Sequence, residues 1–370
     1  NAASTPISPE IIKMMSEMMH SKFANPSSVH SFGRESKIII EKARKSIANL
    51  LNTSPGSIFF TSGGTEADNM AIRCGIESYN IKHAITSKIS HHAVLYPLQS
   101  LEKEGKIELS YVDIDKNGVV SLSHLQSLLA SNSRTFVSIM HANNEIGTIQ
   151  DINTISNICK DYNAIFHSDT VQTIAHFPFN MQELNIDFMA ASAHKFHGPK
   201  GVGFIYISED MNINPLLRGG EQERKMRAGT ENIHAIAGLS MAMEIAYANL
   251  EKESQYIKEL KSYMIDRLKL EIPDVDFYGN CTELDNSLYT VLTVSFPESP
   301  ISEMLLFNLD IMGISCSGGS ACASGNSNGS HVFSTILPNS KRNGIRFSFS
   351  KYNTKEEIDY TIDKLKELFG

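Results

Sequence analysis

Short apolar runs alternate with helical segments through much of this chain of 370 residues. Residues 58–60, 135–141 and 164–168 are such runs, and each ends at a turn of polar residues or glycine. Apolar residues at helical spacing follow several of these turns. The alternation is typical of a mostly parallel sheet with helices on both faces. We therefore expect an α/β fold whose large domain spans residues 15–255, with a smaller α+β domain formed by residues 1–14 and 256–370.

The last third of the chain has a different pattern. Residues 233–270 are helical in periodicity and predict one long helix, or two joined end to end, that leaves the large domain. Strands are expected at 289–296 and 345–349, with a helix at 301–312 between them. Thr354 and Glu357 have the spacing of a capping box, so a final helix is expected to begin there.

The composition is that of an ordinary soluble protein, with 41% hydrophobic and 20% charged residues. Its net charge of -8 gives no reason to expect direct binding to nucleic acid or to a membrane. The five cysteines are scattered, and since no spacing suits zinc, we expect no metal site. A reducing, cytoplasmic location is expected. The chain begins at Asn1 rather than at a methionine, so targeting to an organelle stays open.

A glycine turn joins the first of these strands to a helix in the sequence Thr61-Ser62-Gly63-Gly64-Thr65. The first amides of a helix have no partner within it, so they can bind an anion. Gly64 and Thr65 are therefore candidates to hold a phosphate. The alternative is a plain strand-to-helix turn in which Thr65 only caps the helix.

Polar side chains follow the ends of several expected strands. In a parallel sheet the carboxyl ends of the strands open on one crevice. The residue types suit a phosphorylated pyridine cofactor, because a carboxylate beside the ring nitrogen keeps that nitrogen charged and lets the ring accept electrons. Asp169 fits this role. The full set comprises Thr65, His91, Asn143, Asp169, Gln172, Ser192, His194 and Lys195.

Lys195 lies on a loop between expected strands at 187–191 and 201–207. A lysine at a strand end can hold a carbonyl cofactor as a Schiff base, because burial lowers the pKa of its amine. The alternative is a surface lysine in a turn of glycine and proline. The stretch between Asp169 and Lys195 has room for one helix and one strand, which predicts that the two residues lie on neighbouring strands.

Residues 113–118 match the first half of a calcium-binding loop. The position that requires a bidentate glutamate is His124. We therefore interpret the segment as a hairpin turn with Asn117 and Gly118 at its tip.

Taken together, several segments resemble the motifs of the cysteine desulfurases, pyridoxal-phosphate enzymes with the fold of the class V aminotransferases. The resemblance covers nearly the whole chain in the family's order. Its motifs lie at residues 1–6, 25–30, 61–69, 91–94, 141–150, 167–172, 192–203 and 227–230.

The resemblance implies pyridoxal 5'-phosphate as cofactor, with Lys195 holding its aldehyde, Asp169 facing the pyridine nitrogen and His91 stacking on the ring. Lys195 or His91 is expected to remove the α-proton of the substrate, so both are candidate catalytic residues. Gln172 and Asn143 would lie near the ring oxygen. The phosphate would be held by Gly64, Thr65, Ser192 and His194.

The resemblance also implies a homodimer, because Thr230 is expected to reach the phosphate bound by a neighbouring subunit. Arg346 would clamp the carboxylate of the substrate, L-cysteine, a bidentate task that suits a guanidinium. Asn143 is expected to take part in binding the substrate.

Residues 314–325 are rich in glycine, serine and alanine and cannot pack a core. A thiol on such a loop is accessible, and nucleophilic attack by a thiolate requires access. Cys322 matches the persulfide-forming cysteine of the family, which makes it the expected nucleophile. Cys316 has no counterpart in the family pattern and is interpreted as a small hydrophobic residue at the base of the loop.

The expected activity is that of a cysteine desulfurase, which converts L-cysteine to L-alanine and leaves the sulfur as a persulfide on Cys322. That sulfur would serve iron-sulfur clusters or thio-modification through an acceptor or scaffold protein. Two alternatives stay open: a selenocysteine lyase or another pyridoxal-phosphate lyase or aminotransferase, and an inactive scaffold. Ile89-Ser90 before His91 and Ser350 after the Arg346 strand depart from the family pattern.

Overall fold

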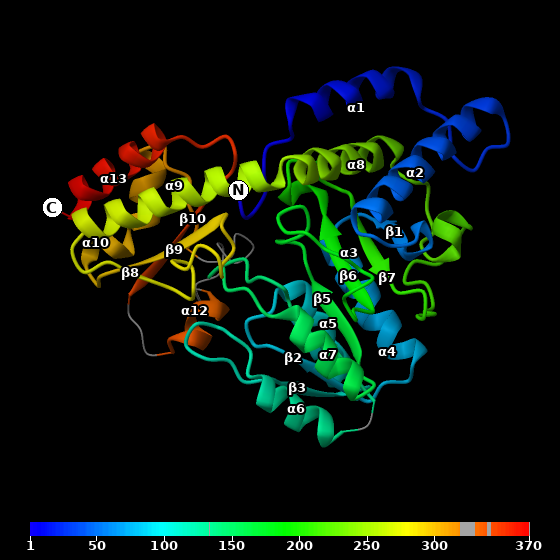
Figure 1. Ribbon diagram of the computed structural model, residues 1–370, viewed down its shortest axis with the longest axis horizontal. Coiled ribbons are helices and arrows are strands. Elements are labelled where there is room, and N and C mark those ends of the chain that lie inside the picture. The colour runs from blue at the N-terminus through cyan, green and yellow to red at the C-terminus, as the bar shows by residue number, and fades with distance from the viewer. Residues whose placement is uncertain (133, 319–329, 339–341, 370) are drawn as a thin grey trace.

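A seven-stranded sheet organises most of the chain in the computed structural model, which describes residues 1–132, 134–318, 330–338 and 342–369 (Figure 1). The strands lie in the order β1-β7-β6-β5-β4-β2-β3. Strands β2 to β6 run parallel, while β7 is antiparallel to both β6 and β1. The predicted α/β fold with a mostly parallel sheet is therefore confirmed. The strands span β1 (Ile58–Thr61), β2 (His83–Thr86), β3 (Glu108–Tyr111), β4 (Thr135–Ser138), β5 (Ile165–Asp169), β6 (Phe188–Ser192) and β7 (Gly203–Ile207).

Helices cover both faces of this sheet because its strands bury side chains on both sides (Figure 1). Successive residues point to opposite faces, so Phe59 and Phe188 pack in one core while Phe60 and Met189 pack in the other. One face is covered by α1 (Pro9–Ser21), α2 (Ser31–Leu50), α6 (Leu122–Ala130), α7 (Ile152–Asp161) and α8 (Ile233–Ala248). The other is covered by α3 (Gly64–Asn69), η2 (Met70–Cys74), α4 (Gly75–Ser78) and α5 (His92–Lys103).

A three-stranded antiparallel sheet in the order β10-β9-β8 organises the rest of the chain. Its core is packed with apolar residues of α9 and α13, which lie on it in the upper left of Figure 1. The elements of this part are α9 (Leu250–Glu271), β8 (Asp276–Phe277), β9 (Val291–Phe296), α10 (Pro300–Glu303), α11 (Leu305–Ile311), α12 (His331–Ile336), β10 (Asn343–Ser348) and α13 (Lys355–Phe369). Among the described residues, no helix combines the length and the apolar character that spanning a membrane requires.

The chain passes from the first core to the second at Asn249, where α8 ends and α9 begins. Of the two forms predicted for residues 233–270, two helices joined end to end is therefore the one found. Ile11 of α1 packs in the core of the large sheet, although the sequence assigned residues 1–14 to the small domain. The predicted boundary at residue 255 falls inside α9, because helical periodicity continues unchanged past the break.

The hairpin predicted at residues 113–118 is confirmed. Ile114 and Val120 form an antiparallel bridge, and the Asp115 carboxylate accepts hydrogen bonds from the amides of Asn117 and Val119. Gly118 supplies the positive φ of 80° that the turn requires.

Candidate active site

A cavity of about 260 Å³ opens at the carboxyl ends of β5 and β6. Side chains reach it from the start of α3, the start of α5, the loop after β4 and the ends of β5 and β6. Most of the predicted site residues are therefore brought together, as the parallel arrangement of these strands requires. The lining residues are Ala3, Gly64, Thr65, Asp68, His91, Met140, Asn144, Asp169, Val171, Gln172, Ser192, His194 and Lys195.

Lys195 ends a single turn of 3-10 helix, η3 (Ala193–Lys195), directly after β6. The chain then returns as β7, and the Ala193 amide donates to the carbonyl of Val202, so both ends of the lysine loop are tied to the sheet. The Nζ atom of Lys195 donates to the carbonyl oxygens of Ala2 at 2.7 Å and Ala3 at 3.0 Å. The segment that begins the chain thus lies against the amine.

Asp169 is the last residue of β5, which pairs directly with β6. The prediction that Asp169 and Lys195 lie on neighbouring strands is confirmed. The Asp169 side chain is 6% exposed, and its Oδ1 accepts a hydrogen bond from the Val171 amide at 3.0 Å. Gln172, one turn further, donates from Nε2 to the carbonyl of Ala2. The carboxylate is thereby fixed on the cavity wall.

His91 caps the N-terminus of α5, and its Nδ1 accepts the amide of Ala93 at 3.1 Å. Burial lowers the pKa of His91, and the positive charge of Lys195 acts in the same direction, against the opposing charge of Asp169. The ring is therefore neutral at neutral pH. Because Nδ1 accepts a hydrogen bond, the proton of the neutral ring is at Nε2. His91 can present a ring face and the Nε2–H donor to the cavity. The lone pair on Nδ1 already accepts the Ala93 amide, so it is not available to take up a proton.

Hydrogen-bond donors form a second group in the cavity lining. Gly64 and Thr65 begin the continuous helical run of residues 64–78, and Ser192, which lies next to Gly64, and His194 also line the cavity. A side chain at Gly203 of β7 would clash with the carbonyl of Ala191 and lie 2.9 Å from the Cα of Gly63, so this turn rests directly on β7.

His194 has a polar atom in this donor group whose hydrogen-bonding capacity is not used. Its Nδ1 is buried and, within the described part of the chain, forms no hydrogen bond. Burial, with Lys195 and Lys200 acting in the same direction, lowers the pKa of His194 to about 4. A neutral imidazole with an unused ring nitrogen can donate a hydrogen bond to an anion bound in the cavity.

The prediction for Asn143 is wrong. Its amide is fully buried in the loop after β4, where Nδ2 donates to the carbonyl of Ile89 and Oδ1 accepts the amides of Glu145 and Ile146. The neighbouring Asn144 lines the cavity instead. Two consecutive asparagines offer the same chemistry, and only the turn geometry decides which of them points inward.

Asp68 also lines the cavity and was missed by the sequence analysis. Its carboxylate is 3.3 Å from Nε2 of His167 in β5, and both side chains are almost fully buried. Burial raises the pKa of Asp68 well above its usual range, and the charge of Asp169 raises it further. In the sequence, Asp68 is one of several polar residues at the start of the helix, beside Glu66 and Asn69, so nothing distinguished it. Within the described ranges, this region included, no three His, Cys, Asp or Glu residues are grouped so that they could hold a metal ion.

Besides Asn143, two described residues of the predicted site, Arg346 and Thr230, are absent from the cavity lining. Arg346 of β10 is 3% exposed and donates from Nη1 to the carbonyl of Asn144 at 2.7 Å. It therefore contacts a residue of the cavity lining. Thr230 is exposed and borders a separate surface pocket beside Phe60. Cys322 lies outside the described residues.

The described residues on either side of Cys322 contact the site region. Ser317 pairs with the backbone of Arg346 in both directions. Ser330 donates to the carboxylate of Glu145 at 2.5 Å, and Nε2 of His331 lies 3.1 Å from the carbonyl of Ser90. Burial raises the pKa of Cys316, on the near side, to about 12, with Asp310 adding to the shift, so this thiol is protonated at neutral pH.

Comparison with known proteins adds independent evidence. Residues 1–361 match the family model of the class V aminotransferases. The chain is 44% identical to a cysteine desulfurase IscS of Dictyoglomus turgidum, over 99% of this chain and 93% of that protein. It is 42% identical to a cysteine desulfurase IscS of Methanosarcina thermophila, over 100% and 90% of the two chains.

Solved structures give the same result. A NifS-like protein superposes with a TM-score of 0.90 at 36% identity, covering 99% of this chain and 97% of its own. The solved structure of SspA in complex with cysteine superposes with a TM-score of 0.81 at 29% identity, covering 95% of this chain and 98% of its own.

Proposed function

Because the chain belongs to the class V aminotransferase family, and within it to the cysteine desulfurases, we propose that the cavity beside Lys195 is where L-cysteine is converted to L-alanine. The observation that carries the proposal is that an amine, a carboxylate and an imidazole line the same cavity, those of Lys195, Asp169 and His91. The family implies the use of pyridoxal 5'-phosphate.

The cavity residues fit such a cofactor. The amides that begin the helical run at Gly64, the hydroxyls of Thr65 and Ser192, and the unused Nδ1 of His194 are donors of the kind that a phosphate requires. Asp169 lies where a carboxylate could pair with a ring nitrogen, and His91 can stack on the ring. We assign the place near the ring oxygen to Gln172 and Asn144 rather than to Asn143.

The bound ring would supply an electron sink for the carbon that loses its proton. Lys195 would hold the aldehyde and, once displaced, take up that proton. His91 is a weaker candidate for this proton, because its Nδ1 already accepts the Ala93 amide. Its neutral ring would instead stack on the cofactor without adding a positive charge that competes with the ring nitrogen for Asp169.

Arg346 and Cys322 complete the proposed reaction. The Arg346 guanidinium, held by the carbonyl of Asn144, would bind the substrate carboxylate. The Cys322 thiolate would form an S–S bond with the substrate sulfur while the Cβ–S bond breaks. The electron pair of that bond stays with the alanine carbon, which takes a proton, and Cys322 keeps the persulfide for transfer to an acceptor protein.

We also propose that the protein is a homodimer. Apolar side chains of the α1–α2 region are strongly exposed, with Phe23 at 76% and Val29 at 89%, and exposed apolar patches of this kind mark protein interfaces. Thr230 is exposed and outside the cavity of its own subunit, as a residue serving a neighbouring subunit would be.

Mixing inactive Lys195→Ala and Thr230→Ala subunits should restore about a quarter of wild-type activity, because half of the dimers are mixed and each has one intact site. Mixtures no more active than their components would contradict shared sites.

The activity is tested by loading the protein with pyridoxal 5'-phosphate and measuring alanine and sulfide formed from L-cysteine. Cys322→Ala should keep the visible absorbance of the cofactor and lose sulfide release. Cys316→Ala is the matched control and should keep both. Sulfide release that survives in Cys322→Ala would refute the assignment of the nucleophile.

The same assay separates the alternatives. A selenocysteine lyase would release alanine from selenocysteine and not from cysteine, and an inactive scaffold would release none from either. Adding candidate acceptor proteins then tests the sulfur transfer, since the rate of alanine formation should rise when the persulfide is removed.

A further inference from the structure

The strand β1 lies at an edge of the large sheet, with β7 on its one paired side. In an antiparallel pair, alternate residues of a strand turn their N–H and C=O groups toward the partner, and the others point away. Three outward groups at this edge nevertheless have side-chain partners: the carbonyl of Ile58, the amide of Phe60 and, just past the strand, the amide of Ser62. These side chains come from α2, α3 and the segment 223–227.

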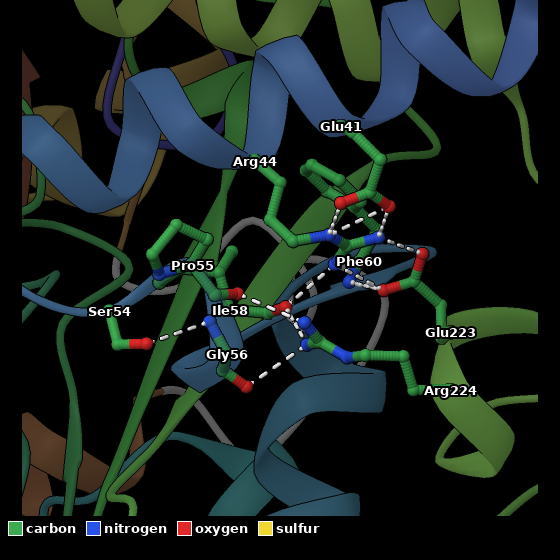
Figure 2. A network of polar contacts seen from close by, with 9 residues as sticks. All are labelled: Glu41, Arg44, Ser54, Pro55, Gly56, Ile58, Phe60, Glu223 and Arg224. Atoms are coloured by element: carbon green, nitrogen blue, oxygen red, sulfur yellow. Dashed lines mark hydrogen bonds and ion pairs between the residues drawn. The ribbon is translucent and has the colours of Figure 1, made fainter.

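The first part of this arrangement is shown in Figure 2. Glu223 accepts the amide of Phe60 at 2.8 Å, while Arg44 and Arg224 donate to the carbonyl of Ile58 at 2.6 and 2.8 Å. Arg44 also binds both oxygens of Glu223 at 2.8 Å, and the two side chains are each only 2% exposed. A buried pair of this geometry holds α2 and the segment around Glu223 in place, because separating the two side chains would leave a buried charge without its partner.

The second part continues along the same edge. The carboxylate of Glu66 accepts the amide of Ser62 at 2.9 Å. Arg227 binds both oxygens of Glu66, at 2.8 and 3.1 Å. Residues 58, 60 and 62 follow the two-residue repeat of a strand, so these side chains occupy the positions that a neighbouring strand would take.

The segment that provides these side chains has an unusual backbone. Glu223, Arg224 and Lys225 have φ values of 45°, 56° and 69°, in the left-handed region that costs free energy for residues other than glycine. Strained backbone persists where surrounding contacts hold it. Here the Arg44–Glu223 pair and the three carbonyls bound by Arg224 provide those contacts.

We propose that Glu223, Arg224 and Arg227, with Arg44 and Glu66, form an edge clamp that positions the cofactor-phosphate turn at Gly63, Gly64 and Thr65. The clamp acts at both ends of that turn, on Phe60 and Ser62 before it and on Glu66 after it. It is distinct from the cavity lining, since none of the five side chains touches the cavity. The role of the turn rests on the proposed function, whereas the contacts of the clamp do not.

Arg227 and Glu66 are the positioning residues best suited to a test, because their side chains are 22% and 11% exposed and lie at the end of the clamp. Arg227→Gln removes the bidentate pair. Arg227→Lys keeps a charge that can reach one oxygen, and Lys225→Gln, in the same segment but with a side chain 73% exposed, is the matched control. Two measurements are made on each purified protein: hydrogen exchange of residues 58–66 without cofactor, and the dissociation constant for pyridoxal 5'-phosphate.

Arg227→Gln should speed exchange at residues 62–66 and weaken cofactor binding about tenfold, with little change in melting temperature. Arg227→Lys should recover part of both effects, and Lys225→Gln should show neither. The proposal is overturned if Arg227→Gln exchanges and binds like the wild type, or if Lys225→Gln matches it.

Two further outcomes are informative. If Arg227→Gln does not fold, Glu66→Gln replaces it, since this variant keeps an oxygen for the Ser62 amide and removes the charge that holds Arg227. Unchanged exchange in Glu66→Gln would overturn the clamp. If the wild type fails to bind the cofactor, the proposed function fails while hydrogen exchange still tests the clamp.

Discussion

The cavity wall and the edge clamp both bring charged side chains together, but the charges have different partners in the two regions. In the clamp, Arg44 meets Glu223 at 2.8 Å with both groups buried, so each charge is neutralised by the other. On the cavity wall, Lys195 donates to the carbonyls of Ala2 and Ala3, and Asp169 accepts the amide of Val171. Charges that face a cavity in this way can act on a ligand, whereas charges that close on each other hold a fold in place.

The comparison predicts that the two regions respond differently to mutation. Cavity residues should affect activity far more than stability, because functional sites are not selected for stability alone. The fully buried clamp residues, Arg44 and Glu223, should affect stability first, because a broken buried pair leaves one charge without compensation.

The largest effect is expected at the amine. Lys195→Ala should lower turnover of L-cysteine roughly a thousandfold or more, since the residue would both hold the cofactor and move a proton. The melting temperature of the cofactor-free protein should stay close to that of the wild type. Lys200→Ala, at an exposed position of the same loop, should leave turnover unchanged. A large loss of stability in Lys195→Ala would remove the contrast between the two regions.

The next effect is expected in the clamp. Glu223→Leu should lower the free energy of unfolding by about 3–5 kcal/mol, because Arg44 is then buried without its partner. The double variant Arg44→Met with Glu223→Leu should recover most of that loss. Denaturant unfolding of the cofactor-free proteins measures both. A double variant no more stable than the single one would show that the pair itself is not the cause.

Asp187 belongs to neither region and provides a third prediction. Its carboxylate is largely buried, and Oδ2 accepts the amide of Phe166 at 2.7 Å. Burial raises the pKa of Asp187 from 3.8 to about 6, against the lowering effect of the Phe166 amide. The raised pKa means that the folded state binds this proton more tightly. Its contribution to stability is therefore complete below about pH 4 and is lost as the pH rises through 6.

Asp187→Asn carries no such proton. Relative to the wild type, it should gain stability between pH 4 and pH 7, by at most roughly 3 kcal/mol. Unfolding curves at a series of pH values measure the difference. A constant difference across this range would show that Asp187 ionises normally in the folded protein.

The smallest effect is expected at the surface. Lys225 and Glu221 form an ion pair at 3.1 Å with side chains 73% and 81% exposed. Lys225→Gln should change the free energy of unfolding by no more than about 0.5 kcal/mol, because water screens the pair. A larger change would mean that the left-handed turn depends on this pair as well as on the buried one.

Much of the site was predictable because its residues follow strand ends. Asp169, Ser192 and Lys195 each come at the end of a strand with a clear apolar pattern, and a parallel sheet brings such ends together. Sequence could not distinguish Asn143 from Asn144, because the choice depends on hydrogen bonds within a turn. It could not reveal Asp68, which becomes significant only once α3 is packed against His167.

The clamp was not predictable at all. Arg44 and Glu223 are separated by most of the large domain, and neither belongs to a local pattern that indicates a pair. The left-handed turn at Glu223 has no glycine to signal it. Likewise, no proline or glycine marks the break between α8 and α9 at Asn249. Local rules therefore predict elements and their ends, while long-range ion pairs and breaks set by packing require coordinates.

The occupied edge of β1 also has a consequence for solubility. The sequence Ile58-Phe59-Phe60-Thr61 is uncharged and rich in residues that favour strands, which is the composition of segments that pair between molecules and aggregate. With the Phe60 amide bound by Glu223 and the Ile58 carbonyl bound by two arginines, the outer edge of this strand is blocked against pairing with another chain. Loss of those contacts would expose a strand edge that can pair with other molecules. Variants of this edge are therefore expected to precipitate during expression before any loss of catalysis is measured.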